Sequence, residues 1–175
     1  MATPTRIMPP GGTESFPAHP SPSPVMIGFG RVLAAAQDLV VAEVDLADNT
    51  GHDPAVDAWF VEARRARDHV LDSIGAVLDL AHVAPGDAHL LPVLRLFRRV
   101  MLSTDAEEIA ALRFAVLELP ERIFALGIDG VDGTVNRLVL RGLDSIEQYL
   151  MAEEVKTAAA GPARIDADCD LLPMF

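Results

Sequence analysis

The chain has 175 residues, half of them hydrophobic, and a formal net charge of -12 at neutral pH. This charge argues against nonspecific binding to nucleic acid or to anionic lipid, because both surfaces would repel the protein. Only 5% of the residues are aromatic, whereas Ala and Leu, which favour helices over strands, are abundant. The single cysteine, Cys169, leaves no pair for an internal disulfide and no zinc site built from cysteines.

The first 24 residues are rich in proline, glycine and serine. Proline fixes φ and removes an amide donor, so we predict a disordered N-terminal arm over residues 1–24. The arm has no apolar stretch of signal-peptide length, and no later window approaches 18 uncharged apolar residues. These observations predict a cytoplasmic protein without a membrane span.

Two long helices are predicted next. The first spans about 26–48, and the second runs from the start signal Asp53-Pro54 to about residue 83. Further apolar residues flank the first stripe, so the first helix is predicted to pack on two sides. The positions predicted to be buried are Phe29, Val32, Leu33, Ala36, Val40, Val44, Val56, Phe60, Ala63, Val70, Ile74, Val77 and Ala81.

Prolines delimit the third and fourth predicted helices. Pro92 is tolerated only in a first turn, so the third helix is predicted to begin near 88–91 and to end near 102. Thr104 and Glu107 have the spacing of a capping box and are predicted to begin the fourth helix. Pro120 is predicted to kink or break that helix, with a short piece continuing to about Leu126. The predicted buried positions are Leu94, Phe97, Met101, Ile109, Leu112, Val116 and Leu119.

A fifth helix is predicted over about 134–157, after a loop at 128–133 with Asp132 or Thr134 as the N-cap. Gly142 lies on the apolar stripe of this helix, where glycine costs roughly 1 kcal/mol relative to Ala. We therefore expect another helix to approach closely at Gly142. The rest of the stripe is Val135, Leu138, Val139, Ile146, Tyr149 and Leu150.

These patterns predict an all-α fold, an up-and-down bundle of about five helices. The helical domain is predicted to span 25–158, followed by a disordered acidic tail over 159–175. The first and fourth helices have wider apolar faces than one neighbouring helix requires. This excess of apolar surface favours a homodimer.

The histidines raise an alternative function, a small metal- or cofactor-binding helical bundle. Its candidate ligands are His69, His82 and His89, each with an Asp nearby in the sequence. The chain lacks the Glu-x-x-His pairs of di-iron bundles, and the residues around His69 are typical of an exposed ion-pair face. We therefore predict no metal ligand and no cofactor.

Catalytic and nucleic-acid sites are not indicated either. No serine lies in a glycine-flanked elbow, and Cys169 lies in a tail that cannot preorganise it, so we predict that the protein is not an enzyme. Arg95, Arg98 and Arg99 form a basic stripe without the interleaved aromatics of an RNA-binding surface. We expect this stripe to pair with the acidic stretch 38–62, within the molecule or between subunits.

The tail ends in a segment that passes from alternating acids to a short apolar run. Such a peptide suits a pocket that takes apolar side chains while basic residues bind the carboxylates. The predicted partner-binding residues are Asp166, Asp168, Asp170, Leu171, Leu172, Pro173, Met174 and Phe175.

This segment resembles the C-terminal peptide of bacterial single-stranded-DNA-binding proteins, in which acids precede a hydrophobic-Pro-Phe ending. Asp166, Asp168 and Asp170 match the acidic part; Leu172, Pro173 and Phe175 match the apolar part, with Met174 interposed. The last four residues are also similar to the apolar end of peptides that bind the bacterial sliding clamp. Both resemblances imply a partner in replication or repair.

The sequence therefore predicts a non-enzymatic helical adaptor or regulatory protein that binds a protein partner through segment 166–175. A further alternative, beside the metal-binding bundle, is a structural subunit of a phage- or conjugation-type assembly.

Overall fold

The computed structural model describes residues 21–48, 55–80, 84–123 and 130–159. Over these ranges the chain is helical apart from short connections, and the predicted all-α fold is confirmed. The elements are α1 (Pro24–Asp48), α2 (Ala55–Leu78), a 3-10 helix η1 (Pro85–His89), α3 (Leu90–Leu102), α4 (Ala106–Ile123) and α5 (Gly130–Ala159).

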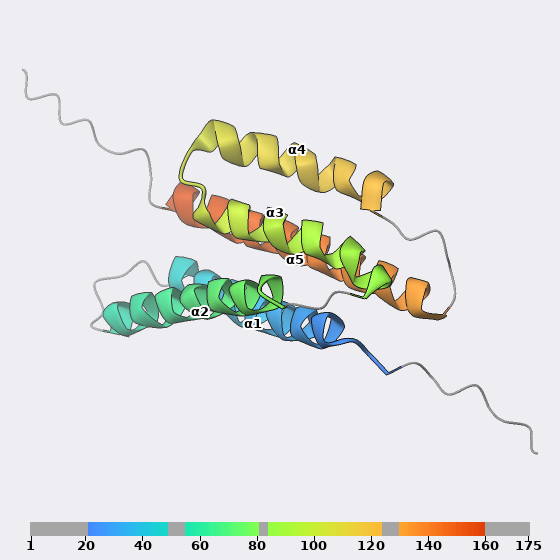
Figure 1. Cartoon of the computed structure of the whole chain (residues 1–175). Coiled ribbons are helices and arrows are strands. Elements are labelled where there is room, and N and C mark those ends of the chain that lie inside the picture. Colours follow the sequence, from blue (N-terminus) through green and yellow to red (C-terminus); the bar gives the residue numbers. More distant parts are fainter. Residues whose placement is uncertain (1–20, 49–54, 81–83, 124–129, 160–175) are drawn as a thin grey trace, which may run out of the picture.

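Each α-helix runs antiparallel to the one before it, which gives the predicted up-and-down bundle (Figure 1). The helices form three layers: α1 beside α2, then α3 beside α5, then α4 alone on the outside. Helix α1 packs mainly against α2 and α5, so it joins the first layer to the second. Helix α4 packs against α3 and α5 and leaves its outer side uncovered.

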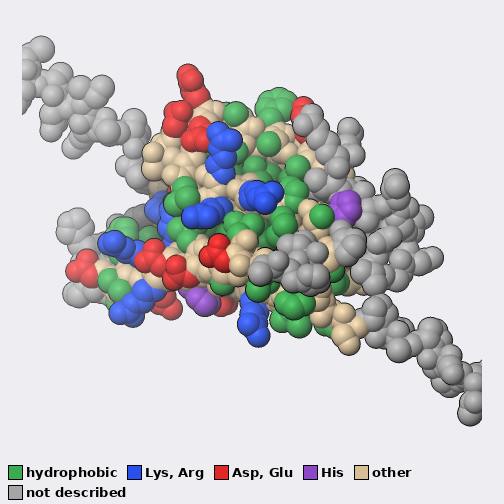
Figure 2. Space-filling view, viewed as in Figure 1, with side chains coloured by type: hydrophobic (Ala, Val, Ile, Leu, Met, Phe, Trp, Pro, Cys, Tyr) green, Lys and Arg blue, Asp and Glu red, His purple; other side chains and the backbone are tan. Residues whose placement is uncertain are grey.

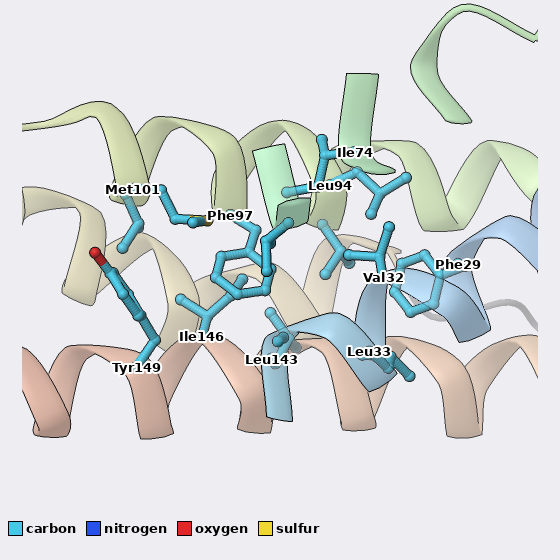
Figure 3. Close-up of a cluster of buried hydrophobic side chains, with 14 of the residues drawn as sticks. Phe29, Val32, Leu33, Ile74, Leu94, Phe97, Met101, Leu143, Ile146 and Tyr149 are labelled. Atoms are coloured by element: carbon cyan, nitrogen blue, oxygen red, sulfur yellow. The ribbon is translucent and has the colours of Figure 1, made fainter. Parts of the chain in front are cut away.

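The core lies between the first two layers. Side chains from α1, α2, α3 and α5 converge there (Figure 3), and the rings of Phe97 and Tyr149 are 6.2 Å apart at a tilted angle of 57°. Burial of each large apolar side chain stabilises the fold by about 1.5–3 kcal/mol. The fully buried large residues are Phe29, Phe97, Leu39, Ile74, Leu90, Leu94, Met101, Ile146, Val25, Val32, Val70 and Val93.

A buried carboxylate ties the start of α1 to the connection before α3. The Ser23 hydroxyl accepts a hydrogen bond from the Met26 amide at 3.0 Å, which caps α1, and donates one to Asp87 at 2.6 Å. The other carboxylate oxygen of Asp87 accepts from the Ala84 amide at 2.9 Å. Asp87 is only 2% exposed, so this capping network satisfies a carboxylate that would otherwise be costly to bury.

The predicted starts of two helices are wrong. Helix α4 is capped by Asp105, whose carboxylate accepts from the Glu107 amide at 3.2 Å, because Thr104 lies one residue too early. Helix α5 already begins at Gly130, so 130–133 is not loop and neither Asp132 nor Thr134 is its N-cap. Glycine disfavours helix only weakly, and packing of the first turns overrides that preference.

Pro120 does not break α4, which continues to Ile123. Proline removes one amide donor and disturbs the carbonyl four residues earlier. Near the end of a helix this cost is confined to one hydrogen bond, and the chain continues for less than one further turn. The predicted end of this piece at Leu126 lies outside the described residues.

Two positions predicted to be buried are exposed: Val44 by 44% and Phe60 by 54%. Both lie toward the end of the α1–α2 layer where these helices are joined, and the facing helices there cannot cover every position of a wide apolar stripe. The side chains of Val56 and Ala81 lie outside the part of the structure that is described.

Among the described helices, α1 is long and apolar enough over Pro24–Ala47 to cross a membrane, judged by length and composition. The packing of α1 in the bundle also explains why this helix is apolar. Phe29, Val32 and Leu39 are each 1% exposed, and the same helix carries the buried Glu43. A central core helix has the same composition as a short membrane span.

Gly142 confirms the expected close approach. A Cβ atom placed there would lie 2.7 Å from Cζ of Phe29 on α1 and 2.8 Å from Cγ1 of Val93 on α3. Both neighbours are 1% exposed, so neither side chain can move away easily. Glycine at this position therefore lets α1 and α3 sit against the middle of α5.

Gly142→Ala should lower the free energy of unfolding by up to about 2 kcal/mol. Overpacking costs typically about 1–3 kcal/mol, from which a gain of roughly 1 kcal/mol in helix propensity is subtracted. Gly75→Ala is the matched control, because nothing lies within 4 Å of its added Cβ, and it should stabilise α2. Urea unfolding followed by circular dichroism measures both, and equal stabilisation by the two variants would contradict the packing argument.

Candidate functional site

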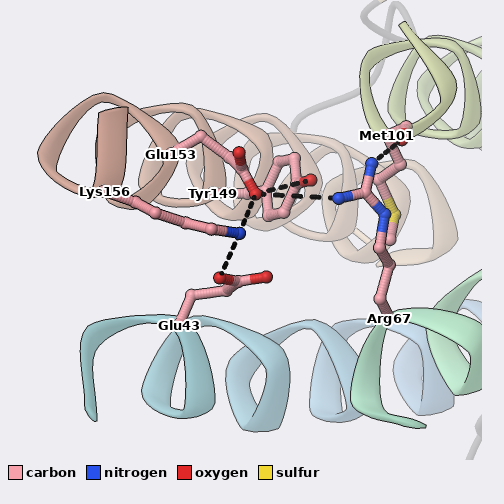
Figure 4. Close-up of polar contacts among 6 residues, drawn as sticks. All are labelled: Glu43, Arg67, Met101, Tyr149, Glu153 and Lys156. Atoms are coloured by element: carbon pink, nitrogen blue, oxygen red, sulfur yellow. Dashed lines mark hydrogen bonds and ion pairs between the residues drawn. The ribbon is translucent and has the colours of Figure 1, made fainter. Parts of the chain in front are cut away.

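One end of the bundle holds a polar cluster built from α1, α2 and α5 (Figure 4). The Glu153 carboxylate is its centre: it accepts from the Tyr149 hydroxyl at 3.2 Å and lies 3.5 Å from Nζ of Lys156 and 3.7 Å from Arg67. Lys156 also donates to Glu43 at 2.9 Å. Glu43 is 2% exposed, so Lys156 neutralises a carboxylate that α1 carries into the core.

Arg67 connects three helices through this cluster. From α2 it donates to the main-chain carbonyl of Met101 at the end of α3, and it pairs with Glu153 on α5. Its guanidinium carbon lies 6.0 Å from the ring centroid of Tyr149, within the range of a cation–π contact. Arg67 thus fixes the position of the Tyr149 ring from one side while the core holds it from the other.

Burial raises the pKa of the Tyr149 hydroxyl well above its ordinary value of 10.0, and the negative charge of Glu153 adds to the effect. Arg67 acts in the opposite direction but less strongly. The hydroxyl therefore stays a neutral hydrogen-bond donor to Glu153 at physiological pH.

A groove of about 720 Å³ opens beside this cluster, between α4 and α5. Its outer wall is a stripe on α4 formed by Ala106, Ala110, Phe114 and Leu117, which share one helix face. Phe114 is 72% exposed and Leu117 is 69% exposed. The other lining residues are Arg67, Val100, Ser103, Ile109, Arg113, Tyr149, Leu150, Glu153 and Glu154.

Polar contacts hold α4 against the body of the bundle. Arg99 on α3 pairs with Glu108 at 2.8 Å, and Ser103 donates to the same carboxylate at 2.9 Å. The Arg99 hydrogen bond, followed by that of Ser103, lowers the pKa of Glu108. Arg113 pairs with Glu154 across the groove at 2.5 Å. These partners are partly exposed, so they orient α4 more than they stabilise it.

The predicted partner-binding residues 166–175 all lie outside the described residues, as does His82. His69 is exposed on α2, where it lines a second groove between α1 and α2 together with Arg31, Asp38 and Ser73. His89 is the last residue of η1, two positions after the buried Asp87. Within the described ranges, no three His, Cys, Asp or Glu side chains are grouped to hold a metal ion.

Within one chain, the described residues do not show the expected pairing between the basic stripe and the acidic stretch, and pairing between subunits stays a prediction. Arg99 pairs with Glu108 of α4, and the buried acid of the stretch, Glu43, pairs with Lys156 of α5. Arg95 and Arg98 are exposed, and Figure 2 shows basic side chains gathered over α3 in the middle of this face.

The sequence prediction missed the residues of this site, but Arg67 and Glu43 carried a signal that could have been recognised. Both interrupt an apolar stripe at a core position: Arg67 lies between Ala63 and Val70, and Glu43 between Leu39 and Leu46. A charged residue at such a position indicates a buried partner, because an unpaired buried charge is too costly. The spacing of the apolar residues on either side of Arg67 and Glu43 therefore carried this signal.

Comparisons with models of protein families, with curated proteins and with solved structures found no match to this chain.

Tyr149 is the sole tyrosine of the chain, so near-ultraviolet tyrosinate absorbance reports its ionisation alone. In the folded protein we expect ionisation only above the pH of about 10 at which free tyrosine titrates, and a return to about 10 in concentrated urea. Because the folded pKa is the higher one, this contribution to stability is complete below about pH 10 and is lost as pH rises through the folded pKa. Tyr149→Phe should remove that alkaline loss. An ordinary midpoint in the native protein would contradict the burial argument.

Lys156→Met should destabilise the fold by about 1–3 kcal/mol, because it leaves the Glu43 carboxylate buried without its cation. This is less than the cost of breaking a fully buried ion pair, because Lys156 itself is partly exposed. Glu43→Leu combined with Lys156→Met should recover most of this loss. Arg113→Met is the matched control at an exposed pair and should cost less than about 1 kcal/mol. Urea unfolding of the wild type and these three variants tests this, and a double variant no more stable than Lys156→Met alone would refute it.

Proposed function

We propose that this protein is a non-enzymatic helical adaptor or regulatory protein that acts by binding other proteins. The observation that carries the proposal is the apolar stripe of α4, which stands exposed over the groove beside α5. Large side chains such as Phe114 and Leu117 are rarely left two-thirds exposed side by side on a monomer unless they meet a partner.

The shape of the groove also suits protein rather than substrate. It is open along α4, has apolar walls, and carries its charges as ion pairs that already satisfy one another. Protein interfaces combine an apolar centre with a polar rim in this way. Tyr149 is only 2% exposed, and its contacts with Glu153 and Arg67 hold the α5 wall of the groove in place.

Segment 166–175 is the second binding element of the proposal. Its acids and apolar residues would dock into a basic-rimmed pocket of a protein partner, and the resemblances of the segment suggest replication or repair machinery as that partner. The bundle would carry this peptide on the end of α5, in the cytoplasm, without contacting nucleic acid or membrane itself.

Deletion of residues 166–175 should leave helicity and the melting temperature unchanged but abolish partner capture in affinity pull-downs. A synthetic peptide of the same ten residues should compete with the full chain for the captured partner. The matched variants are Leu172→Ser with Phe175→Ser, which should lose capture, and Ala167→Ser, which should retain it. Capture that survives the deletion would contradict this role of the segment.

A further inference from the structure

The face formed by α4 and α5 contains a protruding side chain and a hollow next to each other. Phe114 stands 72% exposed at the rim of a groove of about 720 Å³, whereas a cavity of about 150 Å³ is enough to hold benzene. A smaller hollow of about 170 Å³, lined by Leu117 and Met151 among others, continues the groove along α5. A patch that carries both a protrusion and a matching hollow can be complementary to itself.

The charges of this face support the same conclusion. Two copies of a chain with a net charge of -12 repel each other over most of their surfaces. The groove is different, because its lining holds two cations, Arg67 and Arg113, and two anions, Glu153 and Glu154. The groove lining is therefore balanced in charge, so two copies can approach through it with less repulsion than over the rest of their surfaces.

The size of the face places the contact among the small protein interfaces. Helix α4 has 18 residues, which makes it about 27 Å long, and two packed helices are roughly 20 Å wide. Such a face covers about 540 Å² on each copy and about 1,100 Å² in a pair. This is the low end of the sizes of specific interfaces, where weak and reversible association is typical.

We propose that the occupant of the groove is a second copy of this chain, packed isologously so that Phe114 of each copy enters the groove of the other. This inference rests on the proposed function, since it names the protein that the α4–α5 groove binds. A dimer would present two copies of segment 166–175 to a partner, and this raises avidity without any new contact.

Sedimentation equilibrium of the full chain from about 1 to about 100 µM tests the proposal. The wild-type mass should rise with concentration from 18.7 kDa toward twice that value. Phe114→Glu should weaken association at least about 30-fold, the effect of losing a central aromatic contact. Phe60→Glu is the matched control: Phe60 is also an exposed phenylalanine, 54% accessible, but it lies on α2 and should leave association unchanged.

Charge-reversed variants make the test independent of Phe114. Arg113→Glu gives the face an excess of negative charge and Glu154→Arg an excess of positive charge, so each variant alone should remain monomeric. An equimolar mixture of the two should form a heterodimer, because opposite faces then meet. Circular dichroism confirms in each case that the variant is folded.

Three results would overturn the proposal. The first is a wild-type chain that stays monomeric over the whole concentration range. The second is a dimer that Phe114→Glu and the charge reversals leave intact, which would place the interface elsewhere. The third is association that appears only after deletion of 166–175, which would identify the chain's own tail as the occupant. Partner capture by a monomeric chain would still leave the proposed function standing.

Discussion

The architecture depends on how closely α1 can be held between its two neighbours. At Gly28 a Cβ atom would lie 2.6 Å from Val77 of α2, and at Gly142 of α5 one would lie 2.7 Å from Phe29 of α1. The two glycines therefore admit side chains of the facing helices where any other residue would hold the helices apart. With α1 held in this way, α3 can pack over α5 and the core between the layers closes.

The same central position explains the polar cluster. Because α1 is enclosed, its Glu43 enters the core, and it is stable there only because Lys156 reaches it from the last turns of α5. Lys156 also lies 3.5 Å from Glu153, which contacts Tyr149 and Arg67. The buried carboxylate is thus linked to the polar cluster, of which Arg67, Tyr149 and Glu153 line the groove beside α4.

Much of the fold was predictable because apolar periodicity records which side of each helix is covered. The stripes of α3 and α5 were predicted correctly, and Gly142 indicated a close approach because a glycine on a buried stripe needs a compensating contact. Periodicity does not record which helix covers a stripe, so the contacts with Phe29 and Val93 could not be foreseen. Nor does it show how much of a stripe the neighbouring helix covers, which is why Phe60 was predicted to be buried.

The candidate site was less predictable for a related reason. An apolar stripe has the same spacing whether it faces the core or solvent. The stripe of α4 is exposed because this helix forms an outer layer alone, and its residues are Ala106, Ala110, Phe114 and Leu117. The wide apolar face of this helix was visible in the sequence, but its exposure was not.

The position of α4 also determines how easily its wall of the groove can move. Leu112 and Val116 anchor one side of the helix in the core, while Arg99–Glu108 and Arg113–Glu154 hold it through exposed ion pairs that salt screens. A helix with so little buried surface belongs to the least stable part of a bundle and opens most readily. The α4 wall of the groove can therefore move, whereas Tyr149 and Leu150, which are 2% and 5% exposed, hold the α5 wall in the core.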